Sequence, residues 1–236
     1  MVKGLVYKLL SILAIVSSVA VGFPKSAHYK YDIVDKNNKV IGFYEVKIKE
    51  SSQLGYWLIS SSLHRTFSAP EAGLEEKFEI LHDGKKAVSF KAVQVKSDSY
   101  KSDVTRNFEA VLNSGVWSWS VSAGGKSISK SIKETEFDFF EKIVQMTGSK
   151  IFLYPSGKSK RFTGVNPFTL KKTEVDVSVT GKKSVEVGGK IHDAIKLNYQ
   201  TRGSSFSGTK LLDGTTFNVV QKDASLVLTE MEIIKP

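Results

Sequence analysis

The sequence predicts a mainly β protein, built as one large curved antiparallel sheet or half-barrel with one central helix. Apolar and polar residues alternate along much of the chain, as in residues 40–49, and a half-buried strand requires this period of two. Turn-forming residues such as Asp83-Gly84 separate the alternating stretches at intervals of about ten residues. Strands and helices do not alternate regularly, which argues against a parallel α/β fold.

The first half of the chain predicts a series of hairpins. Asp83-Gly84 supplies the positive φ angles that a tight hairpin turn needs, and residues 113–115 and Gly124-Gly125 are further turn sequences. The strands expected between the turns are residues 29–34, 40–49, 55–63, 78–81, 87–95, 104–112, 116–121 and 127–132.

One segment, residues 135–147, has the spacing of a helix. Its apolar residues recur at i, i+3, i+4 and i+7, Thr135 is placed to cap the first turn, and Gly148 is placed to end the helix. The apolar stripe, which we expect to pack against the sheet, consists of Phe137, Phe140, Ile143, Val144 and Met146.

Strands are expected again after an irregular stretch, residues 148–168, which is where an internal boundary would fall. Gly181, Gly188-Gly189 and Asp213-Gly214 mark turns in this half. The expected strands are residues 173–179, 183–187, 191–200, 205–212, 217–221 and 225–234. We therefore treat residues 23–236 as a single β-rich domain.

The first 22 residues have the layout of a secretory signal peptide. Lys3 and Lys8 precede an apolar run, and Ala20 and Gly22 are small residues at the positions that a signal peptidase reads. The run is shorter than the ~20 residues of a membrane span, although a retained anchor is the alternative. The chain has no cysteine, so disulfides and thiolate chemistry are excluded. We expect an exported protein of a bacterial periplasm or exterior.

The chain is basic, with 34 Lys and Arg against 24 Asp and Glu and a net charge of +10 over 236 residues. The charge favours a solvated surface or attraction to an anionic membrane surface, and nucleic acid is not an expected partner in that compartment. A basic cluster that would contact an acidic partner or lipid headgroups, or would be a plain charged loop, consists of Lys158, Lys160, Arg161, Lys171 and Lys172.

The sequence carries no catalytic motif to which we can assign residues, and no cofactor is expected. Its four histidines lack the spacing of a metal site. His82 and His192 are expected to be solvated turn residues. A hydrolase with a spatially assembled site would be favoured if His64 or His192 lay beside a carboxylate and a serine in a cleft.

The tryptophans are more informative. Trp117 and Trp119 are two residues apart on one expected strand, so they point to the same face of the sheet, and Trp57 lies in another strand. That face is either a filled core or an apolar cavity. We take these three residues as the candidate lining of a ligand site.

The order of elements resembles a known group of proteins. The stretches that carry the resemblance are residues 31–34, 40–42, 78–88 and 185–197. They look like secreted bacterial β-rich proteins of unknown function whose sheets resemble those of periplasmic lipoprotein carriers. The resemblance implies an open half-barrel around a helical element, with an apolar concave side, and no catalytic residue.

Three functions are therefore considered. The first is a non-enzymatic exported protein that binds a lipophilic or amphiphilic molecule in its curved sheet. The second is a cell-envelope interaction protein that holds a protein or polysaccharide partner through a sheet edge or the loop at 155–172. The third is the hydrolase with a spatially assembled site.

Overall fold

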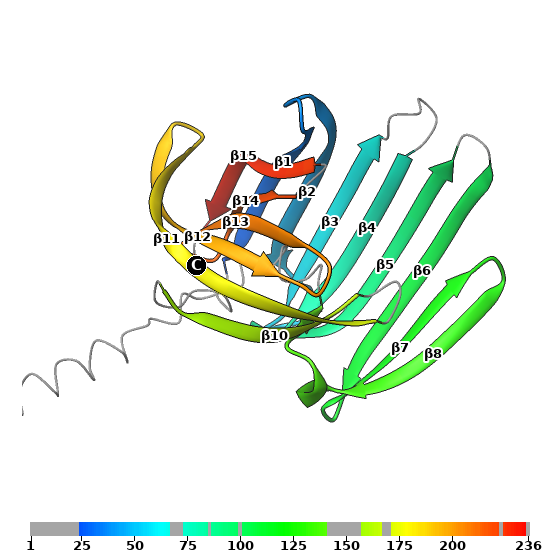
Figure 1. Ribbon diagram of the computed structural model, residues 1–236. Helices are drawn as coiled ribbons and strands as arrows, with labels where there is room; N and C mark the ends of the chain where they lie inside the picture. Colours follow the sequence, from blue (N-terminus) through cyan, green and yellow to red (C-terminus); the bar gives the residue numbers. More distant parts are fainter. Residues whose placement is uncertain are drawn as a thin grey trace, which may run out of the picture.

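A computed structural model describes residues 24–66, 73–84, 86–98, 101–140, 157–166, 171–221 and 224–234. Fifteen strands form one sheet in the order β8-β7-β6-β5-β4-β3-β2-β1-β15-β14-β13-β12-β11-β10-β9 (Figure 1). Neighbouring strands are antiparallel except for the short β9–β10 pair, which is parallel. The sheet curls without closing, because β8 and β9 are its two edges. The expected curved antiparallel sheet is confirmed.

The strands of the first half form a simple meander. They are β1 (Ser26–Asp35), β2 (Val40–Glu50), β3 (Trp57–Thr66), β4 (Gly73–His82), β5 (Ala87–Asp98), β6 (Lys101–Asn113), β7 (Val116–Ala123) and β8 (Lys126–Lys133). The second half follows a short 3₁₀ turn, η1 (Glu134–Glu136). Its strands are β9 (Phe139–Phe140), β10 (Ser159–Val165), β11 (Lys172–Val187), β12 (Lys190–Gln200), β13 (Ser205–Leu211), β14 (Thr216–Val220) and β15 (Ala224–Ile234).

Glycines with positive φ close the tight turns of the meander. The β7–β8 turn consists of Gly124 and Gly125, with φ angles of 55° and 75°. The β6–β7 turn uses Ser114 and Gly115, with φ angles of 50° and 77°. Two central residues with φ > 0 define the type I′ turn, whose twist matches that of the strands it connects.

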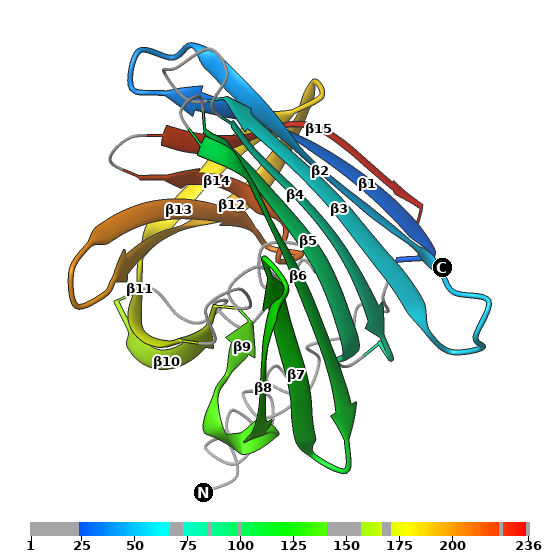
Figure 2. The same ribbon diagram turned by 90° about the vertical axis from the view of Figure 1, so that its right-hand side faces the viewer.

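The buried side chains of β1–β8 lie on one face of the sheet, which we call the inner face. It is the face that carries Tyr31, Ile48, Phe78, Phe90 and Trp119, all of which are members of one buried cluster. Strict alternation within each strand places these residues on the same side of the meander. In Figure 2, β10–β13 curl opposite the wall formed by β1–β6, so the sheet bends toward this face.

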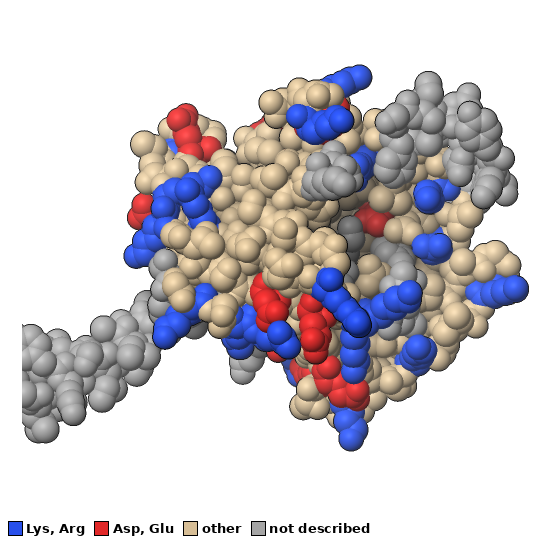
Figure 3. Space-filling model, viewed as in Figure 1, with Lys and Arg blue, Asp and Glu red and all other residues tan. Residues whose placement is uncertain are grey.

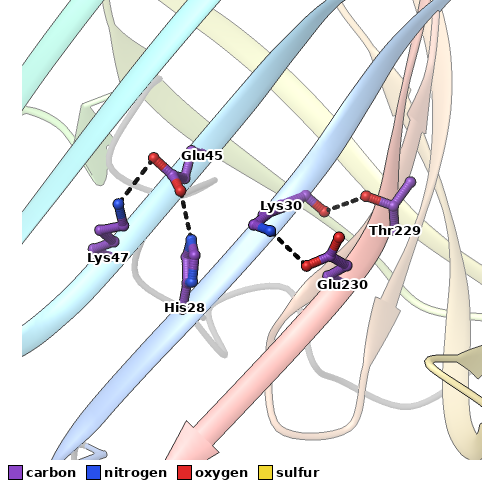
Figure 4. A network of polar contacts seen from close by, with 6 residues as sticks. All are labelled: His28, Lys30, Glu45, Lys47, Thr229 and Glu230. Carbon is purple, nitrogen blue, oxygen red and sulfur yellow. Dashed lines mark hydrogen bonds and ion pairs between the residues drawn. The ribbon is translucent and has the colours of Figure 1, made fainter.

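The outer face carries cross-strand polar pairs. Lys30 Nζ donates a hydrogen bond to Glu230 Oε2 at 2.7 Å, and Glu45 contacts both His28, at 2.6 Å, and Lys47, at 3.2 Å (Figure 4). Thr229 is an extra residue in β15, and its hydroxyl donates to the carbonyl oxygen of Lys30 at 3.1 Å. Solvent screens exposed pairs of this kind and makes them weak, so they mark the outer face rather than stabilise it strongly.

The expected helix at 135–147 is not formed in its described part. After the 3₁₀ turn the backbone is extended at Phe137, and residues 139–140 pair with residues 164–165 of β10. The edge of β10 also binds Asp138, whose N–H donates to the Thr163 carbonyl at 2.8 Å and whose carboxylate accepts from the Thr163 N–H at 2.6 Å. Pairing with β10 replaces the i→i+4 hydrogen bonds of a helix, and residues 141–147 lie outside the described residues.

Within the described residues, no helix is long and apolar enough to span a bilayer. The expected signal segment, residues 1–22, lies outside them. The stretch in which an internal boundary was expected, 148–168, includes β10, which pairs along its length with β11.

Candidate functional site: the inner face

The centre of the inner face is apolar and aromatic. Phe78, Phe90 and Phe108 lie on adjacent strands. The ring centroids of Phe78 and Phe90 are 5.5 Å apart, and those of Phe90 and Phe108 are 5.0 Å apart. Phe78 and Phe90 are at most 1% exposed. The next row across β3 and β4 consists of Ile59 and Ile80, which are fully buried. Rings packed this closely and covered this completely form a filled core in the structure as it stands.

A row of polar residues borders this apolar centre, and we call it the polar row. It consists of Glu76 in β4, Gln94 in β5 and Arg106 in β6, which are direct cross-strand neighbours. Gln94 Nε2 donates to Glu76 Oε1 at 2.7 Å, and an Arg106 guanidinium N–H donates to Gln94 Oε1 at 3.3 Å. Arg106 is exposed, Gln94 is half-buried and Glu76 is 2% exposed, so the row leads from solvent into the interior.

The buried end of the polar row meets two tyrosines. Tyr44 in β2 is 3% exposed, and the nearby side chain of Ser61 acts to lower its pKa. Its ring centroid is 5.7 Å from that of Tyr31. Burial raises the pKa of both phenols, and the charge of Glu76 raises the pKa of Tyr44 further. Both therefore stay neutral hydrogen-bonding groups at physiological pH.

A second polar cluster lies where the β13–β14 turn approaches β1. Lys210 is 2% exposed and donates hydrogen bonds to the Gly214 carbonyl oxygen at 3.0 Å and to Thr216 Oγ1 at 3.2 Å. Burial lowers the pKa of Lys210 to about 8, and the nearby Asp213 opposes this lowering. Burial also raises the pKa of Tyr29 to about 12, although its hydrogen bond with Thr215 works in the other direction. We call this group the lysine cluster.

The structure places all three predicted tryptophans in or against the main buried cluster. Trp117 and Trp119 share the inner face of β7 and are 4% and 5% exposed. Trp119 lies beside Phe137, with ring centroids 6.4 Å apart. Trp57 is half-buried and packs over the β4–β5 turn, where a Cβ on Gly84 would come within 3.0 Å of its ring. Their role as a ligand lining stays a prediction.

Two members of the predicted basic cluster are paired with acidic side chains. Arg161 forms two hydrogen bonds with Asp176, at 2.8 Å and 3.0 Å, and Lys172 forms an ion pair with Glu136 at 2.9 Å. Lys160 lies 4.9 Å from the centroid of the Phe162 ring. Lys158 and Lys171, the other two members, are exposed. In Figure 3, blue atoms are interleaved with red along the lower front of the molecule, where β10 and β11 lie.

The histidines differ in their surroundings. His82 is 7% exposed, so the expectation that it is a solvated turn residue is wrong. Its Nδ1 accepts a hydrogen bond from the Gly84 N–H at 3.0 Å, and burial lowers its pKa to about 4. His64 lies 3.3 Å from Glu75 and stacks on Phe43, but this pair is exposed on the outer face. Within the described residues, no group of His, Asp and Glu side chains could hold a metal ion.

The polar row was missed at the level of sequence, although a signal for it exists. Glu76 shares the inward parity of Phe78 and Ile80 in β4, and Gln94 likewise shares that of Phe90 and Ala92 in β5. Residues two positions apart in a strand share a face, so a polar residue two positions before or after inward-facing apolar residues also faces inward. The alignment of these residues with one another depends on strand register, which the sequence pattern does not provide.

Comparison with known proteins gives the fold alone. No family of known proteins matches the sequence, and no curated protein matches it. Among solved structures, the chain is similar to the crystal structure of a β-barrel-like protein of domain of unknown function DUF1849 from Brucella abortus. The TM-score is 0.61 at 12% sequence identity, over 91% of this chain and 100% of that chain. This supports a likeness to β-rich proteins of unknown function, and the likeness to lipoprotein carriers stays a prediction.

Proposed function

We propose that the protein is an exported, non-enzymatic binding protein that holds an amphiphilic molecule on the inner face of its curved sheet. The observation that carries the proposal is the division of this face into an apolar aromatic centre and a polar row. An amphiphile has the same division, with an apolar chain at one end and a polar head at the other.

The apolar chain would lie against the aromatic centre after the side chains that cover it move aside, because its rings are at most 2% exposed in this structure. Phe78, Phe90 and Phe108 form its continuous core, and Trp119 extends the same cluster into β7. Removal of about 300 Å² of apolar ligand surface from water would contribute about 7 kcal/mol before the costs of ordering are subtracted. This is enough for a carrier that must also release its ligand.

The polar head would meet the exposed end of the polar row. Arg106 offers a planar guanidinium at the border with solvent, and this group binds carboxylate or phosphate in a two-pronged geometry. Its hydrogen bond to Gln94 is long, at 3.3 Å, so its other guanidinium N–H groups are suited to a headgroup. The net charge of +10 would favour approach to an anionic membrane surface.

The test begins with native mass spectrometry and organic extraction of protein purified from the exported compartment. We expect a stoichiometric lipid or other amphiphile. Protein stripped of its ligand should then take up a fluorescent fatty acid. A clean apo mass together with no uptake of fatty acid or anionic phospholipid would overturn the proposal.

Variants assign the site. Arg106→Gln removes the charge at the head position, and loss of one charge-assisted hydrogen bond should weaken fatty-acid binding by roughly tenfold or more. The matched control is Lys91→Gln on the outer face of the neighbouring strand, where Lys91 pairs with exposed Glu109, and its affinity should not change. Trp119→Phe tests the lining with less risk to the fold than alanine, because truncating a buried tryptophan to alanine costs about 3–5 kcal/mol.

A further inference from the structure

The strand β8 is an open edge of the sheet. It pairs with β7 along its whole length, and no strand of the described part of the chain pairs with its other side. Seven of its eight residues are exposed. An edge of this length displays a row of backbone donors and acceptors that another extended chain can use.

The β7–β8 turn fixes which backbone groups face outward. A two-residue type I′ turn makes its flanking residues, Ala123 and Lys126, a hydrogen-bonded pair. Alternation from there points the N–H and C=O groups of residues 126, 128 and 130 toward β7. The N–H and C=O groups of Ser127, Ser129 and Ser131 therefore point to the open edge.

The side chains along this edge define a charge pattern. Lys126, Ile128 and Lys130 share the inner side of the strand, and Ile128 is 61% exposed. Within the part of the chain that the structure describes, neither lysine forms an ion pair. On the other side, Ser129 and Ser131 border a shallow open depression of about 530 Å³, whose floor includes Ser118 and Ser120. In Figure 3, the right-hand part, where β7 and β8 lie, shows blue atoms without red neighbours.

This pattern disfavours a second copy of the chain in the register that places the two Ile128 side chains opposite each other. Antiparallel pairing of two β8 strands about Ile128 would place Lys126 of one opposite Lys130 of the other, on both sides of the centre. Like charges directly opposite each other in a sheet are destabilising. A strand with acidic residues at these two positions would instead complement both lysines.

We propose that β8 is a strand-addition site for an extended acidic segment of another protein. The complementary segment has acidic side chains opposite Lys126 and Lys130 and an apolar side chain opposite Ile128. Backbone hydrogen bonds to Ser127, Ser129 and Ser131 hold it in place, and the small serine side chains leave room on the outer side. The backbone groups of this site belong to the edge strand, two strands away from Arg106, whereas its recognition side chains share the inner face, where Lys130 lies opposite Trp119.

The probe is the blocked peptide TETVTET, labelled for fluorescence anisotropy, with the lysine version TKTVTKT as the control. We expect saturable binding of the acidic peptide and at least tenfold weaker binding of the control. In NMR spectra the amides of Ser127, Ser129 and Ser131 should become protected from hydrogen exchange on binding. Absence of saturable binding up to about 1 mM peptide, or association of the protein with itself through β8, would overturn the proposal.

Two variants separate edge pairing from simple charge attraction. Ser129→Pro removes an outward N–H without removing a β7 hydrogen bond, and proline is tolerated on edge strands. It should reduce binding at least tenfold, whereas Ser129→Ala, which keeps the N–H, should bind as the unaltered protein does. The double variant Lys126→Glu/Lys130→Glu should bind TKTVTKT and reject TETVTET. Equal binding by Ser129→Pro in a protein with an unchanged melting curve would contradict strand addition.

Discussion

A single buried lysine shows how strongly the interior of this sheet acts on one residue. Lys210 is enclosed by the β13–β14 turn and satisfies the Gly214 carbonyl and the Thr216 hydroxyl. Its pKa is lowered from 10.5 to about 8 because burial penalises the charged form. The lowering corresponds to about 3 kcal/mol as an order of magnitude. At neutral pH the buried charge of Lys210 therefore lowers the free energy of unfolding.

This cost predicts an unusual pH dependence. Between about pH 8 and pH 10 the folded protein has released the Lys210 proton while the unfolded chain still binds it, so the free energy of unfolding should rise with pH. Above pH 10 the buried tyrosines oppose the rise, because the unfolded chain loses phenol protons that the folded protein keeps. Urea unfolding at pH 7.5, 8.5 and 9.5 measures the slope.

Lys210→Met should abolish the rise in that window and raise stability at pH 7.5. Lys190→Met, at the exposed first residue of β12, is the control and should keep the slope of the unaltered protein. A free energy of unfolding that changes in parallel for both variants would show that Lys210 is not the titrating group.

Residue-level reasoning from the sequence succeeded where parity alone decides the outcome. Trp117 and Trp119 share a face because they are two residues apart in a strand, and the structure places them on the buried side. Glu76 has the same parity signal but lies opposite Gln94 and Arg106 only through the registers of β4, β5 and β6. His82 was misjudged because a turn sequence says nothing about the Trp57 ring that packs over that turn.

At the scale of elements, turns were predictable and the single helix was not. Positive φ has a sequence signature in glycine, so the turns at Gly84, Gly115 and Gly125 follow from local chemistry. The helical spacing that begins at Thr135 is also local, but the edge of β10 offered the same residues a competing set of hydrogen bonds. Long-range pairing of this kind leaves no periodic signal in the sequence.

The turns give a clean test of backbone strain. Gly115 has a φ of 77°, whereas the φ of Gly181 lies outside the left-handed region, and a Cβ would meet no atom within 4 Å at either position. Gly115→Ala should therefore lower the free energy of unfolding by about 1–2 kcal/mol. Gly181→Ala should leave it unchanged or raise it slightly. Denaturant unfolding of both variants measures the difference, and equal values would refute the strain argument.

At the scale of the whole molecule, export of the protein stays a prediction that rests on the N-terminal segment. The N-terminal segment predicts cleavage after Gly22, so that the mature chain begins at Phe23. Expression of the full chain in a bacterium, followed by fractionation and N-terminal sequencing, should recover this mature form from the exported fraction.

Leu13→Arg, which interrupts the apolar run, should keep the uncleaved protein inside the cell. Leu63→Arg would not be a useful control, because Leu63 belongs to the folded sheet; Lys3→Arg, which keeps the basic start, is the matched one and should be exported normally. Recovery of the uncleaved chain from the membrane fraction would favour the anchored alternative.

The strand order has a consequence for how the chain reaches this structure. Apart from β1 and β15, every pair of neighbouring strands is consecutive in the sequence. The molecule is thus two meanders, β1–β8 and β9–β15, joined along one seam where Ser26 lies opposite Ile234. Within the described residues, pairing of β1 with β15 is the one step that brings together segments about 200 residues apart. Because the loop that it closes costs the most conformational entropy, we expect this pair to form late in folding. A circular permutant that linked the C-terminus to the N-terminus and opened between β8 and β9 would contain local pairings alone.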